Sequence, residues 1–399
     1  MELNYEKLIK FDLVESVEDK LLEDKELMKQ YWGFYETCQQ IKSIDQFIRD
    51  CPSYPGSTKD IIKDELVSAV GATLAIEGTI LNEDEIKESF RKASLKEQLE
   101  RKEQEAENTR KAYEYIKSLV ENHKGEFVYK EEHIKKIHKL LTQNVDYFAN
   151  VPGKYRTLKA SFGDPRRYSL CRDKASINIA MPQLIKWLNT HASGMLSGNI
   201  IVKAFMAHYY LAEIHPFGDG NGRTARALEA LILYVNKINS YCFKSMTKFW
   251  NTNRAEYITH LGNMRFSCDP LDFLIWGAHG FLSEIQRIKE GVLKKLKQLM
   301  LMDYVRWLLA TKKYQKSGRK INQRIYANLA LLTASGKIPF NKFISSPEFK
   351  SLYSGVSVDT KNRDLRKMRS LRLIQTSKEN DEMFIGANYE ILEKIEYVV

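Results

Sequence analysis

The side chains best suited to chemistry lie in one twelve-residue run, residues 215–226, which reads HPFGDGNGRTAR. Its histidine, His215, has an ordinary pKa of about 6.5, so near neutral pH it can take a proton from a weakly acidic hydroxyl. Pro216 disfavours helical geometry at the residue before it. We therefore expect a helix to end at Ile214 and His215 to act as a general base from the loop that follows.

The centre of this run predicts an anion-binding site. The dipeptides within Asp219–Gly222 readily adopt positive φ, and successive residues of that kind gather several N–H groups into one concavity. A helix should begin directly afterwards, with its positive end pointing at the same place. Arg223 and Arg226 share a face of its first turn, and their guanidinium groups match phosphate oxygens. Together these features predict a site for the α- and β-phosphates of a nucleotide.

Asp219 is the one carboxylate within this positive cradle. A carboxylate beside phosphates needs a cation between them, and Mg²⁺ takes one or two carboxylate ligands together with phosphate oxygens. Asp219 is therefore the candidate metal ligand. The spacing is not that of a Walker A loop, and no strand precedes the run as a Rossmann fold requires. A histidine before a proline is usually structural when it stands alone, so the prediction depends on the whole combination.

The run resembles the signature of the Fic family, HPFx(D/E)GNGRxxR, at every specified position. This resemblance implies a nucleotidyl transferase that uses ATP and Mg²⁺ and moves AMP onto a hydroxyl of a target protein. It implies that His215 is the general base, that Asp219 holds the metal and that Phe217 is the buried anchor of the loop. The nucleotide-binding residues that it implies within the run are Gly220, Asn221, Gly222, Arg223, Thr224, Ala225 and Arg226.

Two flanking stretches are similar to less specific parts of the family. Residues 152–168, which begin PGKYR, are similar to the region that leads into the family's flap, which aligns the target segment by main-chain pairing. Asn253, Arg254 and Tyr257 resemble a stretch near the adenine pocket. Asn253 and Tyr257 are therefore candidate nucleotide contacts.

A second group of residues lies earlier in the chain, at Thr73–Gly78. Glu77 falls in the last turn of a predicted helix, where its charge opposes the helix dipole by about 0.3–1 kcal/mol, so a compensating cation is expected. From periodicity alone, a solvent-exposed glutamate is the commoner outcome. The segment is nevertheless similar to the family's inhibitory motif, (S/T)xxxE(G/N), which corresponds to Thr73, Glu77 and Gly78. The resemblance implies that Glu77 pairs with Arg226 through a bidentate contact and that ATP binds the resting protein unproductively.

Composition places the chain among ordinary globular proteins. Hydrophobic residues make up 43% and charged residues 28% of its 399 residues, a length that suits two or three domains with their own cores. The five cysteines form no CxxC pair and no Cys/His ligand spacing, so neither a disulfide framework nor a zinc site is predicted. No stretch reaches the roughly 18 apolar residues of a membrane span. We expect a cytoplasmic protein with no membrane partner.

Helical periodicity dominates the chain, so we predict a mainly α fold in three regions. An N-terminal helical region covers residues 1–120 and includes the inhibitory helix at about 60–78. The Fic core, with a β-hairpin flap, covers residues 121–300. A winged-helix-like domain covers residues 315–399, after a polar and basic linker at 314–320.

Some helices can be predicted individually. Apolar residues at every fourth position predict a helix from Lys59 to Ile76, whereas the Glu- and Lys-rich stretch 82–119 predicts one long exposed helix. Further helices are expected over 128–141 and 193–214. Between these two, residues 152–182 hold three prolines and two glycines, which favours a short hairpin or an irregular flap.

The C-terminal region is predicted to contain helices over 324–334, 341–352 and 359–371, followed by strands at 373–376 and 383–386 that form a wing. Residues 301–399 hold 18 lysines and arginines against 10 acidic residues, so about +8 of the net charge of +11 lies here. This excess is equally typical of a basic surface with no partner and of one that binds nucleic acid.

The third of these helices has the composition of a DNA recognition helix. Three apolar residues are expected to point inward: Leu365, Met368 and Leu371. Four cations are distributed over the remaining surface: Arg363, Arg366, Lys367 and Arg369. Winged helices also serve as dimerisation or docking modules. The domain is therefore predicted either to bind DNA or to act as such a module.

Two classes of function therefore stay open. The first is a protein adenylyltransferase inhibited by Glu77, with enzymatic removal of the same AMP as a variant of that class. The second is a winged-helix DNA-binding regulator whose nucleotide site senses ATP or modifies the protein itself. The sequence does not determine the target protein, the acceptor hydroxyl, the relieving signal or whether the chain forms a homodimer.

Overall fold

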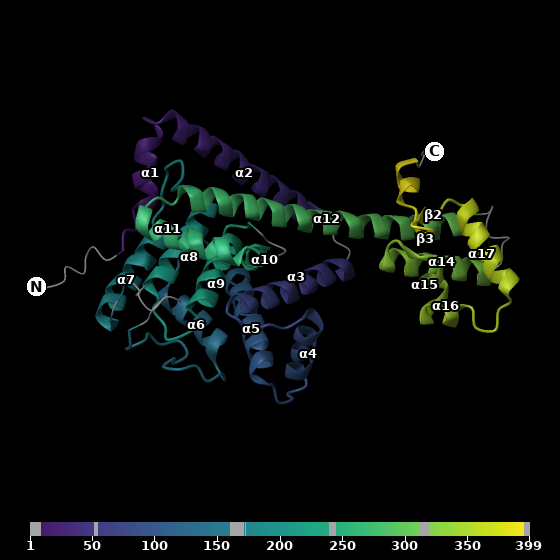
Figure 1. The fold of residues 1–399 in the computed structure, drawn as a ribbon, viewed down its shortest axis with the longest axis horizontal. Coiled ribbons are helices and arrows are strands. Elements are labelled where there is room, and N and C mark those ends of the chain that lie inside the picture. The colour runs from purple at the N-terminus through teal and green to yellow at the C-terminus, as the bar shows by residue number, and fades with distance from the viewer. Residues whose placement is uncertain are drawn as a thin grey trace, which may run out of the picture. The chain divides into compact units, whose positions relative to one another are not determined.

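Figure 1 shows the computed structural model of the chain, which describes most of its residues. The described residues are 9–51, 55–159, 171, 173–238, 245–311 and 319–394. They are mostly helical with a small three-stranded sheet, so the mainly α prediction is confirmed. None of their helices is both long and apolar enough to cross a bilayer.

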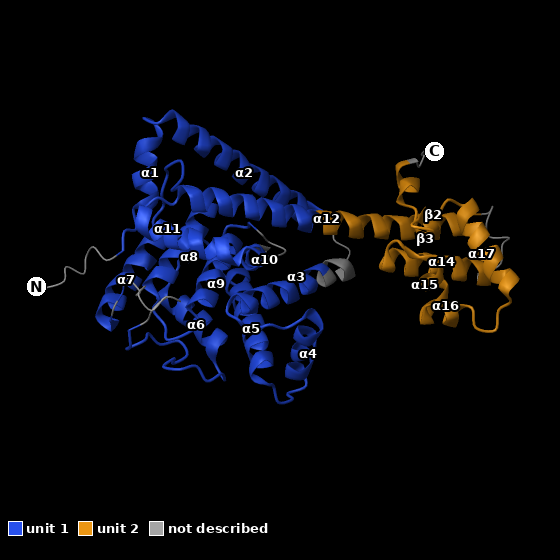
Figure 2. Ribbon diagram, viewed as in Figure 1, with its two compact units in different colours: residues 1–289 blue, residues 290–399 orange. Residues whose placement is uncertain are grey.

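The chain divides into two compact units, residues 1–289 (unit 1) and residues 290–399 (unit 2) (Figure 2). Each unit has buried apolar side chains of its own. The division does not test where the three predicted functional regions begin and end, so those boundaries stay predictions.

Two helices that the sequence analysis left unassigned open unit 1, α1 (Leu13–Leu21) and α2 (Lys25–Asp50). The side chain of Asp24 accepts hydrogen bonds from the N–H groups of Glu26 and Leu27, which satisfies two donors at the start of α2. One face of α1 is buried and apolar, and its residues are Leu13, Val14, Val17 and Leu21. Helical structure therefore begins well before the predicted inhibitory helix.

Helices α3 (Pro55–Ile76), α4 (Glu83–Ser94) and α5 (Arg101–Glu121) lie side by side in unit 1 (Figure 1). The helix predicted to end at Ile76 is therefore confirmed. All three helices contribute to one apolar cluster, whose buried members are Val67, Val70, Leu74, Ile86 and Ala106. This cluster holds the C-terminal half of α3 firmly against its neighbours.

The single exposed helix predicted over residues 82–119 is wrong. The chain turns after Ser94, where Lys96 adopts a φ of 59°, and a new helix starts at Arg101. One face of α5 is buried although it is polar, and its residues include Glu105, Glu107, Asn108 and Thr109. These side chains form hydrogen bonds inside the protein. The polar composition of this helix face therefore did not mean that the face is exposed to solvent.

The remaining helices of unit 1 include two that are buried, α8 and α9, and others that pack around them. Their bounds are α6 (Glu131–Thr142), α7 (Lys174–Leu188), α8 (Ile200–Ile214), α9 (Asn221–Val235), α10 (Ser245–Thr252), α11 (Arg254–Ser267) and α12 (Leu271–Ala310), which continues into unit 2. Helices α8 and α9 pack against each other and are buried on almost every side. The predicted helices over 128–141 and 193–214 correspond to α6 and α8.

The flap can be assessed only in part. The hairpin or irregular flap predicted within residues 152–182 falls partly on residues 160–170, which lie outside the described residues. Residues 174–182, predicted to be irregular, belong instead to α7, so that part of the prediction is wrong. The side chain of Asp173 caps this helix through the N–H of Ser176 at 2.8 Å, and the helix continues through Pro182.

Unit 2 combines helices with the sheet. After α12, its elements are α14 (Arg319–Ser335), β1 (Ile338–Pro339), α15 (Phe340–Ser345), α16 (Pro347–Leu352), α17 (Val358–Ser370), β2 (Ile374–Glu379), β3 (Glu382–Ala387) and the 3-10 helix η2 (Tyr389–Lys394). The strands are antiparallel in the order β1-β3-β2, with Ile374 opposite Ala387. The predicted linker is outside the described residues up to 318, and its last two residues begin α14. The helices predicted over 324–334 and 359–371 and the two predicted strands correspond to α14, α17, β2 and β3, whereas the helix predicted over 341–352 is divided into α15 and α16, and β1 and η2 were not predicted. The winged-helix assignment stays a prediction.

Helix α17 turns its apolar residues to the core of unit 2. Met368 is fully buried, and the partly buried Leu365 and Leu371 pack against the same core. Asp364 is also buried, and its carboxylate lies 2.6 Å from Arg324 Nε on α14. The exposed residues of this helix include Arg363, Arg366 and Arg369.

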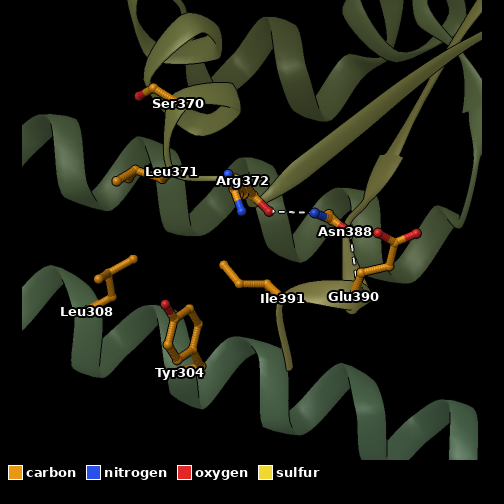
Figure 3. Close-up of a pocket in the computed structure, with 8 residues that line it drawn as sticks. All are labelled: Tyr304, Leu308, Ser370, Leu371, Arg372, Asn388, Glu390 and Ile391. Carbon is orange, nitrogen blue, oxygen red and sulfur yellow. Dashed lines mark hydrogen bonds between the residues drawn. The ribbon is translucent and has the colours of Figure 1, made fainter. Parts of the chain in front are cut away.

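Unit 2 also contains a hollow of about 620 Å³ at the C-terminal end of α17 (Figure 3). Its lining residues are Tyr304, Leu308, Ser370, Leu371, Arg372, Asn388, Glu390 and Ile391. Asn388 Nδ2 donates a 2.9 Å hydrogen bond to Arg372 O across it. None of the residues in the run 215–226 lines this hollow.

Candidate active site

His215 ends α8 and opens the loop that joins it to α9. Its N–H donates a 3.0 Å hydrogen bond to Leu211 O, and its backbone is left-handed, with φ 50° and ψ 56°. Residues with a side chain rarely adopt this conformation. Pro216 disfavours another helical residue at this position, so the helix ends where the sequence predicted.

The imidazole of His215 is neutral. Its Nδ1 lies 3.2 Å from Ala212 O, so we assign the proton to Nδ1 and the lone pair to Nε2. Burial lowers the pKa of His215 to about 4, and the charge of Arg156 acts in the same direction. At neutral pH the ring is therefore in the form that accepts a proton.

The loop after His215 is fixed from inside the protein. Phe217 is fully buried, as expected of an anchor, and its ring stacks on His138 with centroids 3.7 Å apart. The side chain of Asn221 accepts from Phe217 N–H and donates to Phe217 O, both at 2.9 Å. Because these bonds use both ends of the amide, the Asn221 side chain braces the loop, and its contact with the nucleotide stays a prediction.

The start of α9 has the geometry of an anion site. Gly220 caps the helix with φ 73°, a left-handed conformation that favours glycine. Thr224 donates its hydroxyl to Gly220 O at 2.8 Å, and Ala225 is fully buried, so neither side chain is directed at a nucleotide. The Thr224 N–H also donates to Gly220 O, at 2.9 Å, and the nucleotide contacts at these two positions stay predictions.

Asp219 and Arg223 are paired across the first turn of α9. Arg223 Nη2 lies 3.0 Å from Asp219 Oδ1, and the same oxygen accepts a short hydrogen bond from Gly220 N–H. The Asp219 side chain is 45% exposed, whereas the Arg223 side chain is 4% exposed. The carboxylate is thus directed toward solvent, and the guanidinium supports it from below.

Arg226 is buried against the end of α3. Its Nη2 lies 2.6 Å from Glu77 Oε1, and its Nε donates a 2.9 Å hydrogen bond to Thr73 Oγ1. The contact with Glu77 uses one carboxylate oxygen, so the bidentate geometry that was expected is absent from this pair. Gly222 permits the approach, because a Cβ atom there would clash with Glu77 Oε1 and would lie 3.2 Å from Arg226 Nη1.

Glu77 is ionised in this environment. Its side chain is still 38% exposed, and although partial burial opposes ionisation, the charge and hydrogen bond of Arg226 hold the pKa of Glu77 below its ordinary value. Gly78 follows with φ 93° and ends the helix. Arg254 Nε donates a 2.9 Å hydrogen bond to Ile76 O, which adds a second cation beside this helix end.

The two residues predicted near adenine differ in their surroundings. Tyr257 is buried, its hydroxyl lies 2.7 Å from His208 Nε2, and its ring stacks on Trp250. Burial raises the pKa of Tyr257 to about 12, and the nearby Arg226 opposes this shift. Asn253 instead directly precedes α11 without a capping hydrogen bond, and its Nδ2 donates to Phe249 O at 3.1 Å. Tyr257 therefore lies near the Arg226 end of the site, inside the protein.

Two residues for which no individual role was predicted hold the loop in place. Arg156 is buried, and its guanidinium donates to the carbonyl oxygens of His215, Leu158 and Cys171 at 2.6–2.7 Å. His138 Nε2 donates to Asp219 O, and its Nδ1 accepts from Gly153 N–H, both at 2.9 Å. Burial lowers the pKa of His138 to about 4. The helical pattern of the sequence could predict that His138 is buried, but not that it contacts the loop.

The family model described as Fic/DOC matches residues 128–233, which include the loop, Arg156 and His138. The chain contains a Fic/DOC domain. Over 122 residues it is 31% identical to protein adenylyltransferase Fic of Culex quinquefasciatus, covering 31% of this chain and 22% of that protein. Over 90 residues it is 36% identical to protein adenylyltransferase fic-1 of Caenorhabditis elegans, covering 21% of this chain and 16% of that protein. The chain spans about a fifth of the length of these curated relatives.

The Fic/DOC assignment is also consistent with the fold. A crystal structure of a Fic family protein from Desulfovibrio desulfuricans G20 superposes with a TM-score of 0.51 and 16% identity, covering 87% of this chain and 95% of that chain. At this identity the likeness concerns the fold alone. The residues Thr73–Gly78, Asn253 and Tyr257 lie outside the Fic/DOC match, so their roles stay predictions that rest on geometry and on the motif.

Proposed function

We propose that the chain is a protein adenylyltransferase that moves AMP from ATP onto a hydroxyl of a target protein or of itself. The observation that carries this proposal is the position of His215, with its Nδ1 against Ala212 O, on the loop that leads into a helix N-terminus with two buried arginines, Arg223 and Arg226. The helix N-terminus and the guanidinium groups fit the phosphates of ATP. The two relatives are named protein adenylyltransferases, which supports the same reaction.

The reaction is a nucleophilic substitution at the α-phosphorus of ATP. The hydroxyl oxygen of the acceptor attacks this atom, and its proton passes to Nε2 of His215. The bond from the α-phosphorus to the oxygen that bridges to the β-phosphate breaks, and pyrophosphate leaves. The products are an adenylylated hydroxyl and pyrophosphate. Arg156 holds the carbonyl of His215 and so keeps the ring in place.

A divalent cation would be held by Asp219. Mg²⁺ supplies positive charge that offsets the charge of the phosphate oxygens. Among the residues that the structure describes, no three His, Cys, Asp or Glu side chains form a group that could hold a metal. A Mg²⁺ ion would therefore take the exposed carboxylate of Asp219 together with phosphate oxygens, which fits the preference of this ion.

Glu77 inhibits this reaction in the resting protein. Its carboxylate lies on Arg226, so it takes a guanidinium donor that would otherwise bind a phosphate oxygen. ATP binds, but with its phosphates displaced from the position that the reaction requires. Removing the carboxylate would release Arg226 and bring the α-phosphorus into line with the acceptor hydroxyl.

The test is self-modification of the full chain with ATP labelled at the α-phosphate and Mg²⁺. The Glu77→Gly variant should incorporate label strongly, the wild type weakly, and Glu77→Gly/His215→Ala not at all. Glu83→Gly is the matched control, because Glu83 is an exposed glutamate 3.7 Å from Lys87 that touches none of the site residues. Mass spectrometry should find one adenylate on a hydroxyl side chain. Equal labelling in all four proteins would contradict the proposal.

Removal of AMP is tested with the same proteins. Adding unlabelled wild type to labelled Glu77→Gly protein, after the free ATP has been removed, measures loss of the label. Release of AMP that depends on Glu77 would make the wild type a de-AMPylating enzyme. Stable label would leave transfer as the one reaction of the site.

Unit 2 carries the second candidate function, binding of duplex DNA. The observation in its favour is the exposure of Arg363, Arg366 and Arg369 on α17, whose apolar side packs inward. Binding should weaken steeply with salt, and Arg363→Ala/Arg366→Ala should weaken it further. Binding that is indifferent to both changes would exclude this function for α17.

A further inference from the structure

A chain of hydrogen bonds connects the segment that bears Glu77 to Arg223 without passing through Arg226. Thr79 Oγ1 donates to Glu105 Oε2 at 2.7 Å, and Tyr147 OH donates to the other oxygen of the same carboxylate at 2.9 Å. Arg223 Nη1 donates to Tyr147 OH at 2.8 Å, and its Nη2 reaches Asp219. The four links join segments that are far apart in the sequence.

The direction of every bond in this chain is determined by chemistry. A carboxylate only accepts and a guanidinium only donates, so the Tyr147 hydroxyl must accept from Arg223 and donate to Glu105. Burial raises the pKa of Tyr147 to about 12, so its proton is present throughout the neutral range. Because each hydrogen bond can run in only one direction, these side chains are held more firmly than they would be if their hydroxyl groups could rotate between partners.

The three central members of this series of hydrogen bonds are removed from water, which strengthens their contacts. Glu105, Tyr147 and Arg223 are buried, and Thr79 is partly buried. The guanidinium of Arg223 also lies 5.0 Å from the centre of the Tyr147 ring. Hydrogen bonds with a charged partner in such surroundings are stronger than those between neutral groups. A guanidinium that loses one of them is therefore held less firmly in its orientation.

We propose that Tyr147 and Glu105 are positioning residues that orient Arg223 for the phosphates of ATP, and that Thr79 ties them to the segment bearing Glu77 by a route independent of Arg226. The inference rests on the proposed function, because it assigns Arg223 to ATP. It adds a second connection between the inhibitory segment and the phosphate site. Movement of residues 77–79 would then alter both arginines of the run.

The test measures the affinity for ATP with Mg²⁺ by calorimetry, in the wild type and in Glu77→Gly. Tyr147→Phe removes only the bridging hydroxyl and should weaken ATP binding about tenfold. Thr79→Val should weaken it about threefold in both backgrounds, and Thr79→Ser should restore it. Thr79→Val should have no further effect once Tyr147→Phe is present, because the route to Arg223 is already broken. In Glu77→Gly, the KM for ATP should rise more than kcat falls.

Two matched controls separate this role from general stability. Tyr234 donates to Glu121 at an exposed site, and Thr259 donates to a carbonyl of its own helix, so Tyr234→Phe and Thr259→Val should leave ATP binding unchanged. Unchanged affinity in Tyr147→Phe, or fully additive effects of the two substitutions, would overturn the inference. A protein that binds ATP but is never labelled would instead contradict the proposed transfer reaction, and one that binds no ATP would remove both.

Discussion

Arg226 Nε lies 2.9 Å from Thr73 Oγ1, so the buried arginine is hydrogen-bonded one helical turn before its contact with Glu77. Thr73 is itself almost fully buried, and its carbonyl accepts a further hydrogen bond from Arg226 at 3.3 Å. The last turn of α3 thus holds the guanidinium through a hydroxyl, a carbonyl and a carboxylate.

Thr73→Val should partly relieve inhibition. The substitution keeps the shape of the side chain but removes its hydroxyl, which weakens the hold on Arg226 by about 1 kcal/mol, roughly a fivefold change. Self-labelling should therefore fall between that of the wild type and that of Glu77→Gly. Thr333→Val, in which a buried threonine of unit 2 loses a bond to Ala330 O, is the control. Labelling at the wild-type level would mean that Thr73 has no part in the inhibition.

Gly222→Ala should destabilise the wild type but not Glu77→Gly. An added methyl would clash with Glu77 Oε1, at a cost of about 1–2 kcal/mol. Without the Glu77 side chain, alanine in a helix is favoured over glycine by about 0.5–1 kcal/mol. Urea denaturation of the four proteins gives both free-energy differences. A penalty of the same size in the two backgrounds would contradict the close approach of Glu77 to the start of α9.

The free energy of unfolding should fall as the pH is lowered from about 6.5 to about 4. His138 and His215 have a pKa of about 4 in the folded protein and about 6.5 when unfolded, so the unfolded chain binds more protons in this window. His138 is fully buried and contributes a slope of about 1.4 kcal/mol per pH unit. His138→Gln should reduce the slope by that amount when unfolding is measured at several pH values. An unchanged slope would mean that His138 is not held neutral.

Arg156→Lys should lower kcat with little change in the affinity for ATP. A lysine cannot donate in fixed directions to the carbonyls of His215, Leu158 and Cys171 at once, so the loop that carries the base loses its support. We expect kcat in the Glu77→Gly background to fall about tenfold or more. Arg287→Lys is the control, because Arg287 pairs with Glu65 elsewhere in unit 1. A rise in the dissociation constant for ATP at constant kcat would contradict a role in holding His215.

The run 215–226 could be predicted because its chemistry is local. The helix end, the loop and the start of the next helix are all determined by adjacent residues. These residues are the proline after the histidine, the glycines at the turn and the two arginines three positions apart. The Fic/DOC domain and the mainly helical fold followed from the same stretch and from periodicity. The roles of the individual side chains are harder to predict, as Asn221 illustrates, since its amide braces Phe217.

The supporting residues could not be predicted because their contacts span long stretches of chain. His138 meets Asp219 across 81 positions, and Tyr147 meets Arg223 across 76. Glu105 was assigned to a solvated helix face because a buried acid with a hydrogen-bonded partner has the same local pattern as an exposed one. Only the folded arrangement brings these partners together.

The apolar cluster that binds α3 to α4 and α5 limits how Glu77 can leave Arg226. Val67, Val70 and Leu74 are fully buried, so lifting the helix away would expose a large part of this cluster to water. Gly78, directly after Glu77, has a positive φ and, as a glycine, can change its backbone conformation at little steric cost. A relieving signal therefore needs to act only on the final turn, where it would turn the Glu77 side chain aside while the apolar cluster stays assembled.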